Sequence, residues 1–274
     1  MRLFNYNYNN YIKNESGREK MIENKLEYND GSTEQLYFDP IPHKYYWNEN
    51  EIVSATNITK LLTPANVIGL WSAKMCAEKF KELVQAGKSY DEIQLIELYD
   101  KIKKAPNDNM QTAGQIGTLI HDAIEEYIHK GSVPEMHNEQ MIKSFNKFKE
   151  WFDSQEDIEI VATEFRVLSR VHLFCGTVDA LFKNKKTGKY IIYDWKTSSG
   201  IRSSYYVQIY LYKIAICEMF GYEIEEGVIV NATKEGKLNL KSFPIDESCD
   251  ETALACLKMH QFLNPKKRRK KNDQ

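Results

Sequence analysis

The stretch that decides the fold is FCGTVDALFKNKKTGKYIIYDWKTS, residues 174–198. Two runs rich in β-branched and aromatic residues, 171–183 and 190–197, are separated by a Lys-Lys-Thr-Gly turn at 185–188. Such runs around a short turn that ends in glycine predict two antiparallel strands joined as a hairpin. Each strand carries one aspartate among apolar neighbours, which is an unusual place for an acidic side chain.

The second strand of this hairpin ends on an acid and an amine two positions apart, Asp194 and Lys196. Side chains alternate along a strand, so these two share one face and together could hold a divalent metal and an attacking water. The spacing by itself is common, because the same acid-x-Lys pattern occurs at Glu23–Lys25 and at Glu235–Lys237. A solvated ion pair is the alternative at each of these positions, and only its strand context sets the Asp194 copy apart.

Asp179, on the first strand of the hairpin, lies between apolar residues, where an unpaired carboxylate is costly to bury. If the hairpin closes at its turn, Asp179 and Asp194 face each other across the ladder. Two adjacent carboxylates repel unless one is protonated or a cation bridges them, which favours Mg²⁺ or Mn²⁺. The alternative is an Asp179 that pairs with Arg166 or Arg170. Glu164, a third acid on a predicted strand, has its own alternative as an exposed partner of Arg166.

One histidine, His121, lies on a predicted helix whose apolar residues form a broad stripe. It is at the border of that stripe, one turn beyond the small residues Gly117 and Thr118. Small residues let a helix approach a neighbouring element closely, at some cost in helix stability. The histidine is therefore either a satisfied core residue or a ligand held close to the sheet.

A later helix carries an amide and a phenol one turn apart, Gln208 and Tyr212, on a face that Tyr205 extends. Residues at i and i+4 are neighbours on a helix surface, so the amide and the phenol can act together. Aromatic core packing is the alternative interpretation of this face.

Around the hairpin, the C-terminal half of the chain alternates between strands and helices. A strand at 158–168 precedes the hairpin, and it is followed by a helix at 202–220, strands at 223–233 and 237–243, and a helix at 251–263. Helices followed by a β-β-β-α-β series predict an α+β fold, with a mixed central sheet flanked by helices.

The N-terminal half begins with a polar segment. Residues 1–33 are rich in Asn and Tyr and have no periodicity, so we predict that they are poorly ordered, and Met21 could be the true start. Short aromatic and β-branched runs within 34–56 predict a β-meander.

Residues 57–154 are predicted to be largely helical. The predicted helices are 67–85, 91–104, 110–130 and 138–153, with breaks at Gly87, Pro106 and 131–134. We therefore expect one domain over 34–264, consisting of the meander (34–56), the helical part (57–154) and the sheet with its helices (155–264), followed by a basic tail at 265–274.

The small net charge is the sum of an acidic body and a basic C-terminal segment. The 274 residues carry 37 Lys+Arg and 39 Asp+Glu, for a net charge of −2. Residues 266–274 alone contribute +5, so the 265 residues before them sum to −7. The basic run at 266–271 predicts a solvated end, a sequence-independent phosphate contact or a nuclear-localisation-like signal. A hydrophobic fraction of 42% excludes wholesale disorder.

No apolar stretch of about 18 residues is present, and the N-terminus lacks the apolar segment of a secretion signal, so we expect neither a membrane span nor export. The five cysteines are scattered without a CxxC pair: Cys76, Cys175, Cys217, Cys249 and Cys256. This spacing argues against a structural zinc and against an iron–sulfur cluster. We expect a reducing, cytoplasmic setting in a bacterium or a phage-infected host, with a nuclear or organellar location left open.

The order of these motifs resembles the PD-(D/E)XK nuclease superfamily: a histidine on a small-residue helix, a strand glutamate, GTVDAL, a strand ending in DWKTS, and a helical QxxxY. It is most similar to the RecB-type exonuclease branch, which includes phage exonucleases, mitochondrial genome maintenance exonucleases and CRISPR-associated relatives. The similarity spans residues 115–215 and, more loosely, the meander followed by SATNITKLL at 54–62. It implies a restriction-endonuclease-like core with an N-terminal β-meander and a helical insertion.

The resemblance also implies a role for each candidate residue. The metal ligands would be His121, Asp179, Asp194 and the backbone carbonyl of Trp195, with Glu164 completing the acidic set. Lys196 would orient the attacking water and stabilise developing negative charge, and beside two carboxylates it should stay protonated. The residues that would brace the site or contact the nucleic acid are Gln208, Tyr212, Tyr205 and Thr197.

The activity implied is a Mg²⁺- or Mn²⁺-dependent DNA nuclease, and first of all an exonuclease that acts on DNA ends in replication, recombination or repair, of phage or bacterial origin. The cysteine cluster of the iron–sulfur relatives and the GxxxxGK[ST] motif of helicases are both missing from the sequence. We therefore expect no cluster and no nucleotide cofactor. We expect either a helicase or recombination partner, or DNA that is single-stranded or a duplex with a free end. Further strand contacts are expected from the helical part, at Trp71, Lys74 and Lys79.

Three alternatives stay open. An endonuclease or nickase could use the same site. A catalytically silent DNA-binding relative would have lost a ligand or the lysine, yet Asp179, Asp194 and Lys196 are all present. The His121–Asp122 dipeptide is also the signature of HD-type phosphohydrolases, which are all-helical, whereas the acids here fall on predicted strands.

Overall fold

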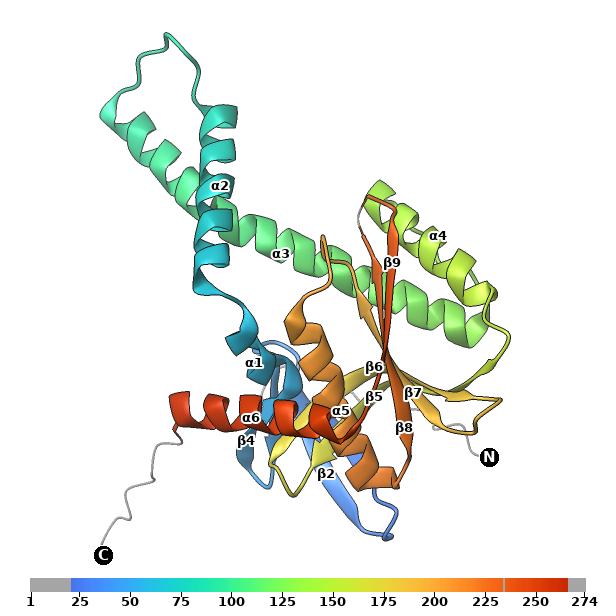
Figure 1. Cartoon of the computed structure of the whole chain (residues 1–274). Coiled ribbons are helices and arrows are strands. Elements are labelled where there is room, and N and C mark those ends of the chain that lie inside the picture. Colours follow the sequence, from blue (N-terminus) through green and yellow to red (C-terminus); the bar gives the residue numbers. More distant parts are fainter. Residues whose placement is uncertain (1–20, 234, 266–274) are drawn as a thin grey trace, which may run out of the picture.

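The structure, a computed structural model, describes residues 21–233 and 235–265 and is built around one mixed β-sheet (Figure 1). The predicted hairpin is present as β6 (Phe174–Asn184) and β7 (Tyr190–Lys196), which are antiparallel. β6 begins at Phe174 and not at residue 171, because residues 170–173 form the turn from β5 (Ile158–Ser169). β8 (Ile224–Ala232) runs parallel to β7, and β9 (Leu238–Pro244) runs antiparallel to β8. The predicted α+β class with a mixed central sheet is confirmed.

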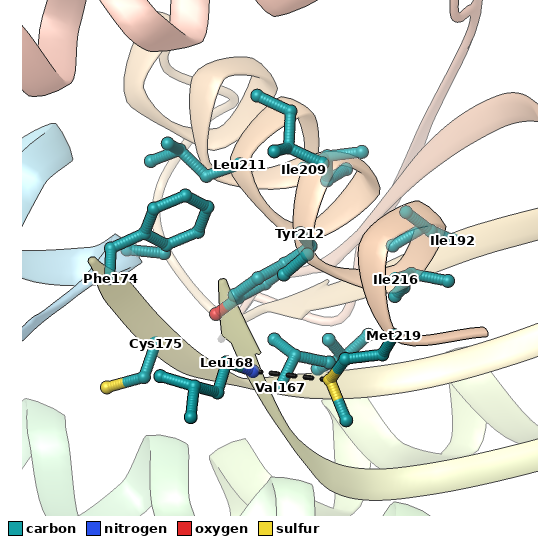
Figure 2. Packing of buried hydrophobic residues seen from close by; sticks show 14 of the residues in the cluster. Val167, Leu168, Phe174, Cys175, Ile192, Ile209, Leu211, Tyr212, Ile216 and Met219 are labelled. Atoms are coloured by element: carbon teal, nitrogen blue, oxygen red, sulfur yellow. Dashed lines mark hydrogen bonds between the residues drawn. The ribbon is translucent and has the colours of Figure 1, made fainter. Parts of the chain in front are cut away.

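Helices cover both faces of this sheet (Figure 1). α3 (Glu92–Lys130) and α4 (Glu139–Asp153) pack on one face, where they share a buried cluster with Phe182, Tyr193 and Trp195. α5 (Ser203–Phe220) and α6 (Glu247–Leu263) pack on the other. Figure 2 shows α5 lying over β5, where the Leu168 N–H approaches Met219 Sδ at 3.3 Å. Because strand side chains alternate, Tyr193 and Trp195 face one pair of helices while Ile192 faces the other.

The N-terminal strands form the predicted meander, which is longer than expected. β1 (Ile22–Glu27), β2 (Thr33–Asp39), β3 (Lys44–Trp47) and β4 (Asn50–Ser54) pair in sequence as antiparallel neighbours, and β4 joins the central sheet beside β6, to which it is parallel.

The prediction that residues 1–33 are poorly ordered is wrong for the part that forms β1. Its apolar side chain Leu26 is fully buried, and just beyond the strand Tyr28 donates a 2.6 Å hydrogen bond to the Leu168 carbonyl. Only every second residue is buried, so the segment looks polar in composition even though one face belongs to the core. Residues 1–20 lie outside the described residues, and the ordered domain begins at least twelve residues before the predicted boundary at 34.

The helical part projects from the body as a long pair of antiparallel helices, α2 (Ala65–Leu83) and the first half of α3 (Figure 1). Short α1 (Ala55–Thr59) and the 3₁₀ turn η1 (Lys60–Leu62) connect this pair to β4. No residue of α2 is buried, so the pair stands largely in solvent.

The prediction of two helices separated at Pro106 is also wrong, because α3 runs through this residue without a break. Proline lacks the N–H that would bond to the carbonyl of Ile102, four positions earlier. The Cys76 thiol of α2 donates to that carbonyl instead, at a distance of 3.4 Å. A tertiary contact therefore satisfies the acceptor that the proline leaves open.

The expectation that no segment spans a membrane can be compared with the part of the chain that the structure describes. There, none of the helices combines the length and the apolar character that crossing a bilayer requires. The basic tail predicted at 265–274 lies outside the described residues beyond Pro265.

Candidate active site

Two strands share one edge of β6 and leave a gap between them. β4 pairs with Phe174 and Cys175 at the start of β6, and β7 pairs with residues 180–183 at its end. β5 occupies the opposite edge along the whole strand. Residues 176–179 therefore have no strand partner on the β4 and β7 side within the described chain, and Asp179 lies in this fork.

Asp179 and Asp194 face each other where the β6–β7 ladder stops. Ala180 pairs with Tyr193 in its last step, so the next position on each strand is an aspartate. Beyond that step the Trp195 N–H donates to Asp179 Oδ2 at 2.7 Å. The structure thus brings together the two acids that the hairpin predicted to be close.

Asp179 does not form the arginine pair that was its alternative. Arg166 donates to Thr177 Oγ1, and Arg170 lies near the carboxylates of Asp30, Glu34 and Glu218. Burial raises the pKa of Asp179, while the Lys196 ammonium and the Trp195 N–H act in the opposite direction. Its carboxylate is therefore a buried acid that depends on a nearby positive charge.

His121, Glu164 and Asp179 converge on one point. One potential ligand atom from each of the three lies within 4.8 Å of the others, and His121 Nδ1 is 4.0 Å from Glu164 Oε1. Both side chains are about a quarter exposed, at 27% and 24%, so solvent reaches this point. Two carboxylates and one imidazole from a helix and two strands are a donor set for a divalent cation.

Glu164 enters the site because of a local break in the strand. Its φ is +45°, a left-handed conformation that is costly for a residue with a side chain. Thr163 Oγ1 lies 2.6 Å from His129 Nε2, so two consecutive residues of β5 both contact α3. In a regular strand one of them would point to the opposite face. Burial, and then Asp179, raise the pKa of Glu164 well above its ordinary value.

Asp194 is completely buried and lies beside the lysine of its motif. Its Oδ2 forms an ion pair with Lys196 Nζ at 2.6 Å, and among the described residues Oδ1 has no hydrogen-bond partner. Burial and the neighbouring Asp179 raise the pKa of Asp194 to about 7, against the pull of Lys196. A buried carboxylate with one oxygen left unpaired fits a cation ligand.

Lys196 stays charged in spite of its environment. Burial alone would lower its pKa, but the carboxylates of Asp194 and Asp179 outweigh burial and raise the pKa above its ordinary value. The ammonium also lies 5.0 Å from the centre of the Tyr205 ring. The lysine is therefore a fixed positive charge at neutral pH, as expected for it from the two nearby acids.

His121 stays neutral for the opposite reason. Burial, and then the Lys196 charge, lower its pKa to about 4, so its ring has a free lone pair at neutral pH. Its helix reaches the end of β7 because residue 117 is glycine: a Cβ there would lie 3.2 Å from Thr197 Oγ1. The small residue thus places the histidine near the sheet, as the sequence suggested, and places Thr197 against α3.

The amide and the phenol of α5 contact each other under the fork. Gln208 Nε2 donates to the Tyr212 hydroxyl at 2.7 Å and lies 3.4 Å from Thr56 Oγ1. The Tyr212 ring packs so closely on Gly176 that a Cβ there would be 2.6 Å from it. Tyr205, one turn earlier, donates to Ser198. These side chains contact the segments that hold the site residues in place.

Some residues around the site were not among the site residues expected for a nuclease, although Asp122 was noted in the His121–Asp122 dipeptide. Glu125 and Asp122 on α3 both raise the pKa of Glu164, and His129 contacts Thr163. The spacing of His121, Glu125 and His129, each four positions apart, places them on one side of the helix and was a signal that could have found them. In contrast, Trp71, Lys74 and Lys79 lie on the projecting α2, where both lysines form ion pairs with neighbouring glutamates of the same helix.

The alternative of an all-helical HD-type site does not fit this geometry. The acids that face His121 come from β5 and β6, and no second helix supplies a ligand to the described cluster.

A family model described as PD-(D/E)XK nuclease superfamily matches residues 133–270 of the chain. Among solved structures, the chain is similar to SSO0001, at 15% identity over 82% of this chain and 81% of that one, with a TM-score of 0.36. It is also similar to a candidate exonuclease from Eubacterium rectale, at 10% identity over 73% and 84% of the two chains, with a TM-score of 0.35. No curated protein matches the sequence. The family match begins after α3, so it includes the site residues of the strands but not His121.

Proposed function

The chain belongs to the PD-(D/E)XK nuclease superfamily, and on this basis we propose that it is a Mg²⁺- or Mn²⁺-dependent deoxyribonuclease that digests DNA from its ends. The observation that carries the proposal is the meeting of His121, Glu164 and Asp179 beside the Asp194–Lys196 pair in the fork of the sheet. Hydrolysis of a phosphodiester needs acids that hold a cation and a positive charge that faces the developing negative charge.

The residues present fit a hard divalent cation. The ligand atoms of the triad lie within 4.8 Å of one another, and Asp194 adds a buried Oδ1 that has no hydrogen-bond partner among the described residues. The ligands would be His121, Asp179, Asp194 and the Trp195 carbonyl, with Glu164 as the further acid. When bound, such a cation lowers the pKa of a water and neutralises the phosphate charge that would repel the nucleophile.

Lys196 would act by charge rather than as a base. Because two carboxylates keep it protonated, it can donate to the attacking water and to a non-bridging phosphate oxygen, but it has no lone pair with which to take a proton. The Tyr205 ring limits where the ammonium can move. Tyr212 and Gln208 would hold the strands of the fork at the right separation.

An exonuclease is preferred over an endonuclease because the motifs are most similar to the RecB-type branch. In that setting the enzyme would process DNA ends in replication, recombination or repair in the cytoplasm of a bacterium or phage-infected host, with a helicase or recombination partner where the DNA is duplex. A catalytically silent DNA-binding protein has less support, because the metal-binding acids and the lysine are all present and converge.

The experiment that tests the function uses single- and double-stranded DNA labelled separately at each end, together with a covalently closed circle, in Mg²⁺ or Mn²⁺. The wild type is compared with Asp194→Ala and Lys196→Ala. We expect metal-dependent shortening of the linear DNA, no cutting of the circle, and loss of the shortening in both variants.

A matched control removes the lysine of another acid-x-Lys pattern, Lys25→Ala, on the exposed side of β1. It should leave cleavage unchanged. If cleavage survives both Asp194→Ala and Lys196→Ala, the site assignment is wrong. If the closed circle is cut, the enzyme is an endonuclease and not an exonuclease.

A further inference from the structure

Arg166 is a partly buried cation beside the acidic site. It follows Glu164 by two positions on β5 and lies directly across the ladder from Thr177. Its Nη1 donates to Thr177 Oγ1 at 2.5 Å, and its guanidinium lies 5.1 Å from the centre of the Phe38 ring. Its Nε is buried and has no hydrogen-bond partner among the described residues. A buried donor without an acceptor costs free energy, so Arg166 is held here at some cost to stability.

The acids of the site do not supply that acceptor. Arg166 lowers the pKa of Glu164, which shows that the two charges interact, yet no carboxylate of the described chain lies within ion-pair distance of the guanidinium. Arg166 as a whole is only partly buried, so it can offer its positive charge to an anion from outside the chain. A phosphate of the DNA matches this charge.

The position of Arg166 relates it to the DNA that the site would cut. Thr177 precedes Asp179 by two positions and Arg166 follows Glu164 by two, so the Arg166–Thr177 pair lies two residues along both strands from these acids. Alternate residues of a strand are about 7 Å apart. A phosphate held beside Arg166 would therefore belong to the nucleotide next to the one at the metal-binding acids.

Further nitrogen groups continue in the same direction, toward the β-meander. The His43 ring lies 4.9 Å from the Phe38 ring, and the positive charges of Arg166 and Lys60, after burial, lower the pKa of His43. Lys60 is exposed and lines a pocket of about 810 Å³ with Asn57 and His260. The one carboxylate of that pocket, Glu51, is paired with Lys44 at 2.7 Å.

We propose that Arg166 binds the phosphate of the DNA strand adjacent to the phosphate that is cut, and that Lys60 contacts the same strand further along the meander. The proposal rests on the proposed nuclease function and adds to it the path of the strand. It also explains how an acidic body can hold a polyanion: the acids of the fork take the cation, while a separate row of nitrogen groups takes the phosphates.

The test measures steady-state cleavage of end-labelled single-stranded DNA by the full chain over a series of salt concentrations. Arg166→Gln should raise KM about tenfold, with kcat within about threefold, and should make the slope of log(kcat/KM) against log[salt] shallower by about 0.7. Arg166→Lys keeps the positive charge and should restore the slope and most of KM. Lys60→Gln should also raise KM and make the salt slope shallower.

The matched control is Lys186→Gln, which removes a positive charge at the exposed β6–β7 turn, far along the strand from Asp179. It should leave KM and the salt slope unchanged. Melting temperatures show whether each variant folds; if Arg166→Gln does not, Arg166→Lys and the exposed Lys60→Gln carry the comparison.

An Arg166→Gln variant that folds and keeps the wild-type KM and salt slope overturns the proposal. So does a loss of kcat with an unchanged slope, since Arg166 would then only position the acids. Failure of the nuclease function itself is visible separately, because the wild type would then not cut DNA in any salt.

Discussion

The Trp195 backbone N–H donates a 2.7 Å hydrogen bond to Asp179 Oδ2, at the point where the β6–β7 ladder ends. The side chain of Asp179 thus replaces a strand carbonyl as acceptor and joins the two strands across the fork. The same carboxylate contributes an oxygen to the cluster with His121 and Glu164. One residue therefore has a structural and a chemical task, and substitutions can separate the two.

Asp179→Asn should separate them. Its amide oxygen can still accept the Trp195 N–H, so the free energy of unfolding should stay within about 1 kcal/mol of wild type in a urea titration. Asp179→Ala leaves that N–H unpaired and should cost about 1–3 kcal/mol. Both variants should lose cleavage by at least about 100-fold, because a metal ligand is lost. An Asn variant that cleaves within tenfold of wild type would show that this carboxylate is not a ligand.

Asp194 should make metal-free stability depend on pH. Its pKa is about 7 in the folded protein, above its ordinary value of 3.8, so the folded state keeps a proton that the unfolded chain releases. The stability from this proton is complete below about pH 4 and is lost as the pH rises through about 7. His121, with its pKa lowered to about 4, has the opposite sign and partly offsets this change.

The comparison of wild type with Asp194→Asn isolates the aspartate, since both proteins contain His121. Without metal, wild type should lose stability relative to the variant between about pH 5 and pH 8. Mg²⁺ should raise the melting temperature of wild type more at pH 8 than at pH 5, because the ligand must be deprotonated, and should stabilise by about 2.7 kcal/mol at 100 times Kd. Parallel pH profiles for the two proteins would contradict the raised pKa.

Gly117→Ala should reduce metal affinity without unfolding the protein. Alanine favours the helix by about 1 kcal/mol over glycine. However, its Cβ would lie 3.2 Å from Thr197 Oγ1 and would move α3, with His121, away from the sheet. We expect metal affinity by calorimetry to fall several-fold while the melting temperature changes little.

Gly114→Ala is the matched control for this substitution, because it lies on the same helix with no atom within 4 Å of the added Cβ. It should gain helix stability and keep full metal affinity. Equal affinities for the two alanine variants would mean that the close approach at residue 117 does not position the histidine.

Pro106→Ala should stabilise the projecting helices without changing cleavage. The new N–H can bond to the Ile102 carbonyl, which accepts from the Cys76 thiol in the wild type. Hydrogen exchange of the amides around residue 106 should slow by an amount equivalent to about 1–3 kcal/mol. Pro106→Gly restores the N–H without the helix preference and should give a smaller effect. Faster exchange in the alanine variant would contradict this account of the proline.

The strands and helices around the hairpin were predictable because their signals are local. The glycine turn after Asn184 and the alternation in β7 are both patterns of consecutive residues. They predicted the strand register that places Asp179 opposite Asp194. β1 was missed because a strand with one buried face has a polar average composition. The break at Pro106 was predicted from the missing N–H, but the thiol that compensates for it comes from a residue thirty positions earlier.

By itself, the sequence determined the hairpin, the alternation of strands and helices, and the residue types from which a cation site can be made. Only the tertiary structure decided which of these residues meet. The left-handed backbone at Glu164 turns its side chain toward α3, and Gly117 lets that helix bring His121 to the same point. It also pairs Arg166 with the Thr177 hydroxyl rather than with an acid of the described residues. Contacts of this kind depend on distances between segments far apart in the chain, and local preferences of consecutive residues carry no information about such distances.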